Sequence, residues 1–235
     1  MFRKIKRYWY RITHPVIGEV WQLHRVTNEV SEEVAQRDFE ISPNRLINLI
    51  EEYLRKGYCF VSVDRLCDMI NTNKFDKKFV VVTLDDGYAD NFEIAYPLLK
   101  QYQIPFCIFI TKDFIDNGKK LYQMLSEDQI KQLSNDSLCT IGSHTVTHPH
   151  LSRLTVEEQC KEINVCGDWL ASLIGHPVTC FAYPYGDYNK ETLADIKQSG
   201  LSCAFSAWGG PIRDKRNLSK YEIPRSIIME STILY

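Results

Sequence analysis

Short apolar segments alternate with longer amphipathic segments along most of this chain of 235 residues. The apolar segments have the length and composition of strands, and those between them have the period of helices. Because strands that alternate with helices form parallel sheets, the pattern predicts an α/β fold. The predicted strands are residues 16–23, 58–63, 79–84, 105–110, 138–142, 178–182, 203–205 and 223–228. The predicted helices are residues 43–56, 63–71, 91–102, 126–133, 155–174 and 190–199.

Polar residues follow three of these predicted strands at the point where each strand ends. The three sets are Asp85 with Asp86, then His144, then Pro184-Tyr185-Gly186. In a β/α barrel the carboxyl ends of all strands meet at one mouth, so residues distant in sequence converge there. The sequence therefore predicts a barrel-like domain with its functional site at this mouth.

The composition bounds the class of protein. Hydrophobic residues make up 44% of the chain and charged residues 25%, as in soluble globular proteins. A single domain over residues 13–235 accounts for the length, and a net charge of −2 gives no basis for binding nucleic acid. The eight cysteines include no C-x-x-C pair, and several, such as Cys107, lie in apolar runs. This favours buried free thiols in a reducing compartment over a disulfide framework.

Residues 1–12 form a basic and aromatic segment that lacks the apolar core of a signal peptide. No stretch of the sequence approaches the ~20 apolar residues of a membrane span. We expect a solvated terminus in a cytoplasmic protein. The alternative is peripheral contact of residues 1–11 with the inner face of the membrane, through their basic side chains and Trp9.

Two strings carry side chains suited to a divalent metal: Thr83-Leu84-Asp85-Asp86-Gly87-Tyr88 and Ser143-His144-Thr145-Val146-Thr147-His148. One Asp and two His leave an open coordination position, as a hydrolytic site needs. The i, i+4 spacing of His144 and His148 predicts that they share one face of a helical turn. Beside Gly87 the backbone can turn both carboxylates to the mouth, so that one binds metal and the other takes a proton from bound water. These residues alone leave open which Asp is the base.

Together with Phe181-Ala182-Tyr183-Pro184-Tyr185-Gly186, these strings resemble the three successive motifs of the NodB-type polysaccharide deacetylases, carbohydrate esterase family four. The resemblance implies a distorted (β/α) barrel of about seven strands that removes N-acetyl, and in some members O-acetyl, groups from sugars with a divalent metal, usually zinc. It also implies residue roles. Asp85 would be the general base, Asp86, His144 and His148 would hold the metal, and the Tyr185 N–H would stabilise the oxyanion.

The sequence departs from the family's pattern at two places. Many members carry an Arg in the third motif that braces the base, where Ala182 and Tyr183 stand here. Members also carry a Leu-x-His motif near the C-terminus that supplies the general acid, whereas no His follows His176 in this chain. If the family's residue roles were transferred to this chain motif by motif, the departing amine would have no proton donor.

Other parts of the chain offer replacements. The segment Trp21-Gln22-Leu23-His24-Arg25-Val26 resembles the permuted branch that includes the poly-N-acetylglucosamine deacetylases, in which the acid-bearing strand comes first. We therefore predict His24 as the general acid, with a structural histidine as the alternative. Arg225 is a candidate brace for Asp85, the alternative being a surface ion pair. Trp208 and Tyr88 are candidate sugar-stacking walls, although core or rim aromatics are the default.

The predicted function is a metal-dependent hydrolase of carbon–nitrogen bonds other than peptide bonds. It would remove an N-acetyl group, or as second choice an O-acetyl group, from a sugar in polysaccharide or glycan biosynthesis. The expected partner is an N-acetylated sugar or glycan intermediate, with a nucleotide- or lipid-linked form as the candidate. One alternative is an inactive carbohydrate-binding or assembly protein that keeps the barrel. Another is a metal phosphoesterase, which the absence of a glycine-rich cradle or added cations in these strings disfavours.

Overall fold

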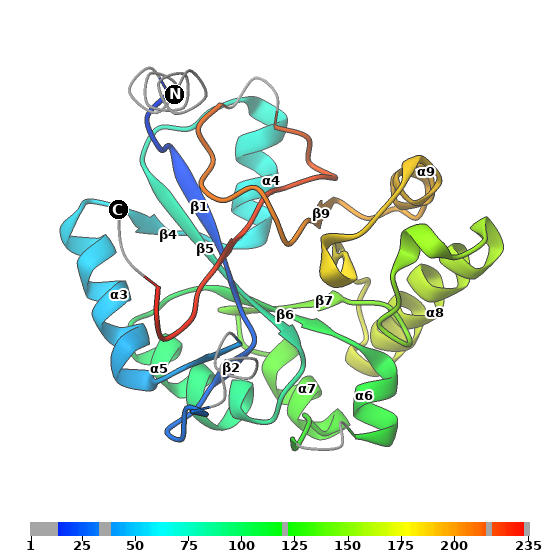
Figure 1. The fold of residues 1–235 in the computed structure, drawn as a ribbon, viewed down its shortest axis with the longest axis horizontal. Coiled ribbons are helices and arrows are strands. Elements are labelled where there is room, and N and C mark those ends of the chain that lie inside the picture. Colours follow the sequence, from blue (N-terminus) through cyan, green and yellow to red (C-terminus); the bar gives the residue numbers. More distant parts are fainter. Residues whose placement is uncertain (1–13, 33–38, 119–121, 215–217, 233–235) are drawn as a thin grey trace.

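The computed structural model describes residues 14–32, 39–118, 122–214 and 218–232. Its centre is a parallel sheet in the order β10-β1-β5-β6-β7-β8-β9, and β4 pairs with the start of β5 (Figure 1). A separate two-stranded sheet consists of β2 (Arg25–Val26) and β3 (Glu40–Ile41). The strands of the main sheet are β1 (Gly18–Leu23), β4 (Cys59–Phe60), β5 (Phe79–Asp86), β6 (Phe106–Ile110), β7 (Cys139–Ser143), β8 (Cys180–Ala182), β9 (Cys203–Phe205) and β10 (Ser226–Ile227).

The chain around Ile223 joins the two ends of the main sheet. Ile223 N–H donates to the Ala204 carbonyl of β9 at 3.0 Å, and the Ile223 carbonyl accepts from Ser206 N–H at 2.8 Å. Directly afterwards β10 pairs in parallel with β1, which aligns Gln22 with Ile227. The sheet therefore curls into a distorted (β/α) barrel, and the predicted fold class is confirmed.

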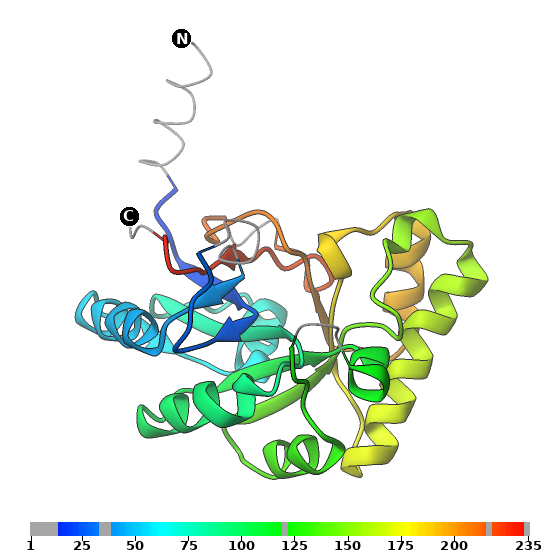
Figure 2. The same ribbon diagram turned by 60° about the horizontal axis from the view of Figure 1, so that its bottom comes forward.

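Alternation along β5 separates its side chains into an outer and an inner layer. Val82 and Leu84 pack outward against apolar side chains of α3, α5, α7 and α8, which lie outside the sheet (Figure 2). Val81 packs inward among residues of β1, β6, β8 and β9. The same register carries Asp85 to the inner face at the mouth of the barrel. The helices are α3 (Pro43–Arg55), α4 (Val63–Thr72), the π-helical turn η1 (Asn91–Ala95), α5 (Tyr96–Gln101), α6 (Lys112–Asn117), α7 (Glu127–Ser134), the 3-10 turn η2 (Leu151–Arg153), α8 (Val156–Ile174), the 3-10 turn η3 (Pro184–Gly186) and α9 (Lys190–Gln198).

Most predicted elements occur near their predicted positions, and the differences have local causes. The helix predicted over 91–102 consists of the π-turn η1 followed by α5, because Pro97 has no N–H to donate to the preceding turn. The pattern does not predict α6, β2 or β3, which are too short to show a clear period. The helix predicted from Thr155 begins with a capping box in which the Thr155 hydroxyl accepts from Glu158 N–H.

The structure bears on the prediction about the cysteines but not on the one about the N-terminal segment. All eight cysteines lie in the described ranges and are free thiols, as predicted. The predicted basic segment at residues 1–12, with its membrane contact, lies outside the described residues. Within the described ranges, no helix combines the length and the apolar character that crossing a membrane requires.

Candidate metal site and catalytic pocket

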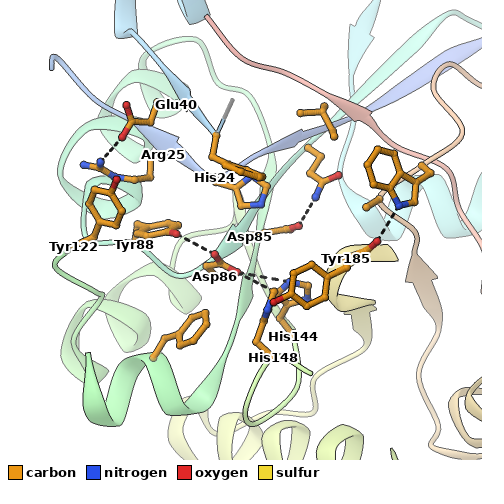
Figure 3. Close-up of a pocket in the computed structure, with 16 residues that line it drawn as sticks. His24, Arg25, Glu40, Asp85, Asp86, Tyr88, Tyr122, His144, His148 and Tyr185 are labelled. Atoms are coloured by element: carbon orange, nitrogen blue, oxygen red, sulfur yellow. Dashed lines mark hydrogen bonds and ion pairs between the residues drawn. The ribbon is translucent and has the colours of Figure 1, made fainter. Parts of the chain in front are cut away.

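A pocket of about 410 Å³ opens at the carboxyl ends of the strands. Figure 3 shows His24, Asp85, Asp86, His144, His148 and Tyr185 gathered around it. These side chains come from the ends of β1 and β5, the loop after β7, and η3. The convergence predicted from the sequence is therefore found in the structure. The pocket is also lined by Gln22, Arg25, Phe39, Glu40, Tyr88, Phe114, Tyr122, Ala207, Trp208 and Ile227.

Asp86, His144 and His148 present one possible ligand atom each, all within 4.8 Å of one another. Asp86 Oδ1 lies 3.8 Å from His144 Nε2 and 3.5 Å from His148 Nε2. Ligands placed tetrahedrally about 2.1 Å from a zinc ion would be separated by about 3.4 Å. The donor set and its spacing therefore fit a divalent ion.

Neighbouring groups orient these donor atoms. His144 Nδ1 lies 2.7 Å from the Ala182 carbonyl, which can only accept, so the Nδ1 atom carries the proton and Nε2 presents a lone pair. The Tyr88 hydroxyl donates to Asp86 Oδ2 at 3.1 Å, and Oδ1 faces the histidines. Desolvation and the Asp86 charge raise the pKa of Tyr88, so its hydroxyl stays a donor.

The backbone departs from regular structure at the candidate metal ligands. Asp86 ends β5 with a φ of +76°, which turns its side chain out of strict strand alternation. Residues 144–148 form an irregular loop in which Thr145 and His148 have φ of +70° and +59°. The prediction that His144 and His148 share a helical turn is therefore wrong. Their rings meet, with centroids 4.8 Å apart, because the loop reverses direction and not because of helical period.

Glu162 of α8 fixes this histidine loop. Its carboxylate accepts from the N–H groups of Val146 and Thr147 at 2.8 and 2.9 Å, and from the Thr147 hydroxyl at 2.7 Å. The Thr145 hydroxyl accepts from His148 N–H at 3.0 Å. Sequence reasoning missed Glu162, since nothing in the α8 sequence distinguishes it from other helix carboxylates. These bonds offset the strain of the positive φ values.

Asp85 is fully buried and held by three donors. Arg225 Nη1 and Nη2 donate to Asp85 Oδ1 and Oδ2, each at 2.7 Å, and Gln22 Nε2 donates to Oδ2 at 2.9 Å. Burial disfavours the charged carboxylate, but the Arg225 guanidinium outweighs this and holds the pKa of Asp85 below its ordinary value. The structure thus places Arg225, which is 1% exposed, as the predicted brace and not as a surface ion pair. Arg225 also donates to the Ser206 carbonyl and the Thr83 hydroxyl.

His24 follows β1 and faces the acidic pair across the pocket (Figure 3). Its ring packs edge-on against Phe39, with the centroids 4.8 Å apart. Burial lowers the pKa of the imidazole, while the charges of Asp86 and Asp85 raise it to a smaller extent. The position predicted for His24 is therefore found, and its role as general acid stays a prediction.

Tyr185 lies at the rim in a left-handed conformation, with a φ of +59°. Its ring stacks on His150 at a centroid distance of 4.1 Å and meets His148 edge-on at 4.7 Å. Trp208 Nε1 donates to the Tyr185 carbonyl at 2.9 Å. This bond fixes the peptide after Tyr185. Trp208, 64% exposed, lies at the pocket rim, whereas Tyr88 is buried beside Asp86. Stacking of a sugar on either ring stays a prediction.

A charged cluster on the opposite wall was also missed. Arg25 donates to Glu40 Oε1 at 2.7 Å and to Asp90 Oδ2 at 2.8 Å, and its guanidinium lies 4.1 Å from the centroid of the Tyr122 ring. These contacts tie the small sheet β2-β3 to the start of η1. The residues come from short elements without a sequence period, so only the structure brings them together.

Comparison with known proteins connects this site to a family. Residues 72–204 match the family model described as polysaccharide deacetylase. YxkH of Bacillus subtilis is 29% identical over 193 residues, which make up 82% of this chain and 65% of YxkH. The chain therefore spans a little less than two thirds of that relative. Poly-beta-1,6-N-acetyl-D-glucosamine N-deacetylase of Staphylococcus aureus is 29% identical over 204 residues, 83% of this chain and 69% of the relative.

Solved structures share the fold. Deacetylase PplD of Streptococcus pyogenes, in complex with acetate, has a TM-score of 0.80 and 22% identity, and the match covers 91% of this chain and 92% of PplD. De-N-acetylase from Aggregatibacter actinomycetemcomitans has a TM-score of 0.77 and 21% identity over 92% of this chain and 97% of that chain. At these identities the likeness shows the barrel alone.

Proposed function

Because the chain belongs to the polysaccharide deacetylase family, we propose that it is a metal-dependent hydrolase that removes an N-acetyl group from a sugar of a polysaccharide or glycan. The observation that carries the proposal is the set Asp86, His144 and His148 beside a second, braced carboxylate, Asp85, in one pocket. A purely binding protein has no need of a base next to a metal site.

Asp86 Oδ1, His144 Nε2 and His148 Nε2 would hold the ion, for which zinc is our choice because the donors are one carboxylate and two imidazoles. When bound, the ion would supply Lewis acidity that polarises the acetyl carbonyl and lowers the pKa of water.

Asp85 is the proposed general base. An ionised carboxylate has about four acceptor positions, and Arg225 and Gln22 occupy three of them. One position therefore stays available to take the proton of the attacking water. The bidentate Arg225 contact fixes the carboxylate plane, so the base does not reorient during the reaction.

His24 is the proposed general acid for the departing amine. Its lowered pKa means that a protonated His24 gives up its proton more readily than an exposed imidazolium would. The Tyr185 N–H is the proposed oxyanion donor, held at the rim by the left-handed turn of η3. Proton uptake at Asp85 and proton delivery from His24 complete the replacement of the C–N bond by a C–O bond, releasing acetate and the free amine.

For the substrate, we propose an N-acetylglucosamine-containing glycan, with O-acetyl removal as the second choice. The Staphylococcus aureus relative is named for poly-beta-1,6-N-acetyl-D-glucosamine, and the apolar rim around Trp208 suits the faces of sugar rings. A nucleotide- or lipid-linked form of the sugar is part of this proposal, as is a role in glycan biosynthesis.

The test measures acetate release from β-1,6-linked N-acetylglucosamine oligomers by zinc-loaded and chelator-treated protein. Asp86→Ala removes a ligand and should abolish both zinc binding and acetate release. Asp85→Asn is the matched control, which should keep zinc binding and lose turnover by several orders of magnitude. The proposal fails if zinc-loaded protein releases no acetate from acetylated amino sugars, or if Asp86→Ala binds zinc as tightly as the wild type.

A further inference from the structure

The small sheet β2-β3 presents pocket residues that the proposed chemistry does not use. Arg25 of β2 and Phe39, the residue before β3, both line the pocket. The Arg25 backbone N–H donates to the Phe39 carbonyl at 3.1 Å, so the two residues are held side by side. This sheet is separate from the main sheet, so closure of the barrel does not account for these side chains.

The Arg25 guanidinium is fixed in place, but only part of it is used (Figure 3). Its Nη1 donates to Glu40 Oε1 at 2.7 Å, its Nε donates to Asp90 Oδ2 at 2.8 Å, and one face lies 4.1 Å from the centroid of the Tyr122 ring. Nη2 has no hydrogen-bond partner among the residues that the structure describes, and it is not one of the enclosed polar atoms that lack one. Its N–H groups are therefore accessible, on a residue of the pocket wall.

The charges around Arg25 favour an uncharged acceptor. Burial raises the pKa of Asp90 to about 6, so this carboxyl is mostly ionised at pH 7. Together with Glu40 it places two carboxylates against the one guanidinium. A phosphate or carboxylate of a ligand would meet an excess of negative charge here. A hydroxyl or amide oxygen meets no such repulsion, and its bond to a charged donor is stronger than one between neutral groups.

Phe39 adds an exposed apolar ring to the same wall. It is 47% exposed although it lines the pocket, and its ring contacts the His24 ring at a centroid distance of 4.8 Å. An exposed aromatic ring beside an accessible donor matches a sugar unit, which has both apolar C–H faces and oxygens that accept hydrogen bonds. The contact with His24 joins this wall to the catalytic part of the pocket.

We propose that Phe39 and Arg25 form a second sugar subsite, which binds the unit next to the one that loses its acetyl group. The Phe39 ring packs against the apolar face of that unit, and Arg25 Nη2 donates to one of its hydroxyl or acetamido oxygens. Glu40, Asp90 and Tyr122 are positioning residues that act through the guanidinium. The inference rests on the proposed function and deepens it, because it makes the preferred substrate an oligomer and not a single sugar.

The experiment measures acetate release from the methyl glycoside of N-acetylglucosamine and from a β-1,6-linked tetramer of the same sugar. Zinc-loaded wild type is compared with Arg25→Lys, which keeps a positive charge for the two carboxylates but lacks the second donor nitrogen, and with Phe39→Ala. Wild-type kcat/KM per acetyl group should be about tenfold or more higher on the tetramer, and each variant should lose most of that factor on the tetramer alone. Leu54→Ala truncates a similarly exposed apolar side chain of α3 outside the pocket, and this control should change neither value.

The ratio of the two kcat/KM values separates a subsite from a structural role. If the variants lower kcat/KM by the same factor on both sugars, Phe39 only positions His24 and Arg25 only supports the wall, and the proposal is overturned. Equal wild-type values on both sugars, or an unchanged tetramer preference in both variants, overturn it as well. Phe39→Ala truncates a half-exposed ring, so it decides the question should Arg25→Lys not fold. Absence of acetate release by the wild type is a different result, which overturns the proposed function itself.

Discussion

Replacing Arg225 by Met tests how the buried Asp85 carboxylate, the proposed base, is held. Arg225 is 1% exposed and donates to both oxygens of Asp85 at 2.7 Å, to the Ser206 carbonyl at 2.8 Å and to the Thr83 hydroxyl at 3.1 Å. Arg225→Met leaves the Asp85 carboxylate in the barrel interior with Gln22 as its remaining donor. Removing one partner of a buried ion pair costs about 3–5 kcal/mol, so we expect a loss near the middle of that range.

The assay is equilibrium urea unfolding at pH 7 in the presence of a chelator, so that metal binding does not contribute. Asp85→Asn and the double variant Arg225→Met/Asp85→Asn complete a double-mutant cycle. The double variant should be more stable than the sum of the two single losses predicts, by at least about 2 kcal/mol, because no unpaired charge is left buried. A loss below about 1 kcal/mol for Arg225→Met, or additive single losses, would refute the argument.

Measuring kcat gives a second test of the contact between Arg225 and Asp85. Arg225→Lys keeps the positive charge but cannot donate to both carboxylate oxygens in one plane. We expect it to retain most of the stability and to lower kcat about 10- to 100-fold, since the base is no longer fixed in orientation. Unchanged kcat in Arg225→Lys would show that charge alone suffices at this position.

Three further expectations follow from the same geometry. Glu162→Gln should weaken zinc binding by about 10- to 100-fold in calorimetric titration, because it withdraws the charged acceptor of the histidine loop, and an unchanged affinity would contradict that role. Zinc at 1,000 times its Kd should stabilise the wild type by about 4 kcal/mol, and a chelator should remove this gain, whereas Asp86→Ala should show neither effect in thermal unfolding. Burial raises the pKa of the Cys166 thiol to about 11, so its stabilising contribution is complete below the unfolded thiol's pKa and is lost as the pH rises toward 11. The stability difference between wild type and Cys166→Ala should therefore shrink by about 2 kcal/mol between pH 8 and pH 11, and a constant difference would show that Cys166 ionises as in the unfolded chain.

The barrel could be predicted from the sequence because most of its strands are recognisable as apolar runs of typical strand length. The run 79–84 is buried along its whole length, and β5 continues two residues further, through Asp86. The placement of polar residues behind three strands sufficed to locate the mouth. The short elements β2, β3 and α6 could not be predicted, because two to six residues carry no measurable period.

The candidate site was predictable in its residue types and not in its geometry. Spacing indicated that His144 and His148 act together, but it suggested a helical turn where the structure has a loop with two positive φ values. That loop depends on Glu162, which approaches from a helix later in the chain, and no local pattern carries such a contact. Gln22 was missed for a related reason. Its role depends on the register of β1 against β5, which only pairing reveals.

The absence of an Arg from the third motif is explained by packing, because a buried tyrosine occupies the position where that Arg would stand. Tyr183, where a brace would be sought, is fully buried, and its hydroxyl donates to the Tyr221 carbonyl at 2.9 Å, so it packs away from Asp85. The guanidinium arrives instead from the segment that closes the barrel, one strand beyond β1. Arg225 directly precedes β10 and His24 directly follows β1, so the pairing of these two neighbouring strands brings both residues to the site although they are distant in sequence. The brace of the proposed base Asp85 and the proposed acid His24 are therefore in place only when the barrel is closed, and loss of the closing strand should abolish turnover even where Asp86, His144 and His148 remain.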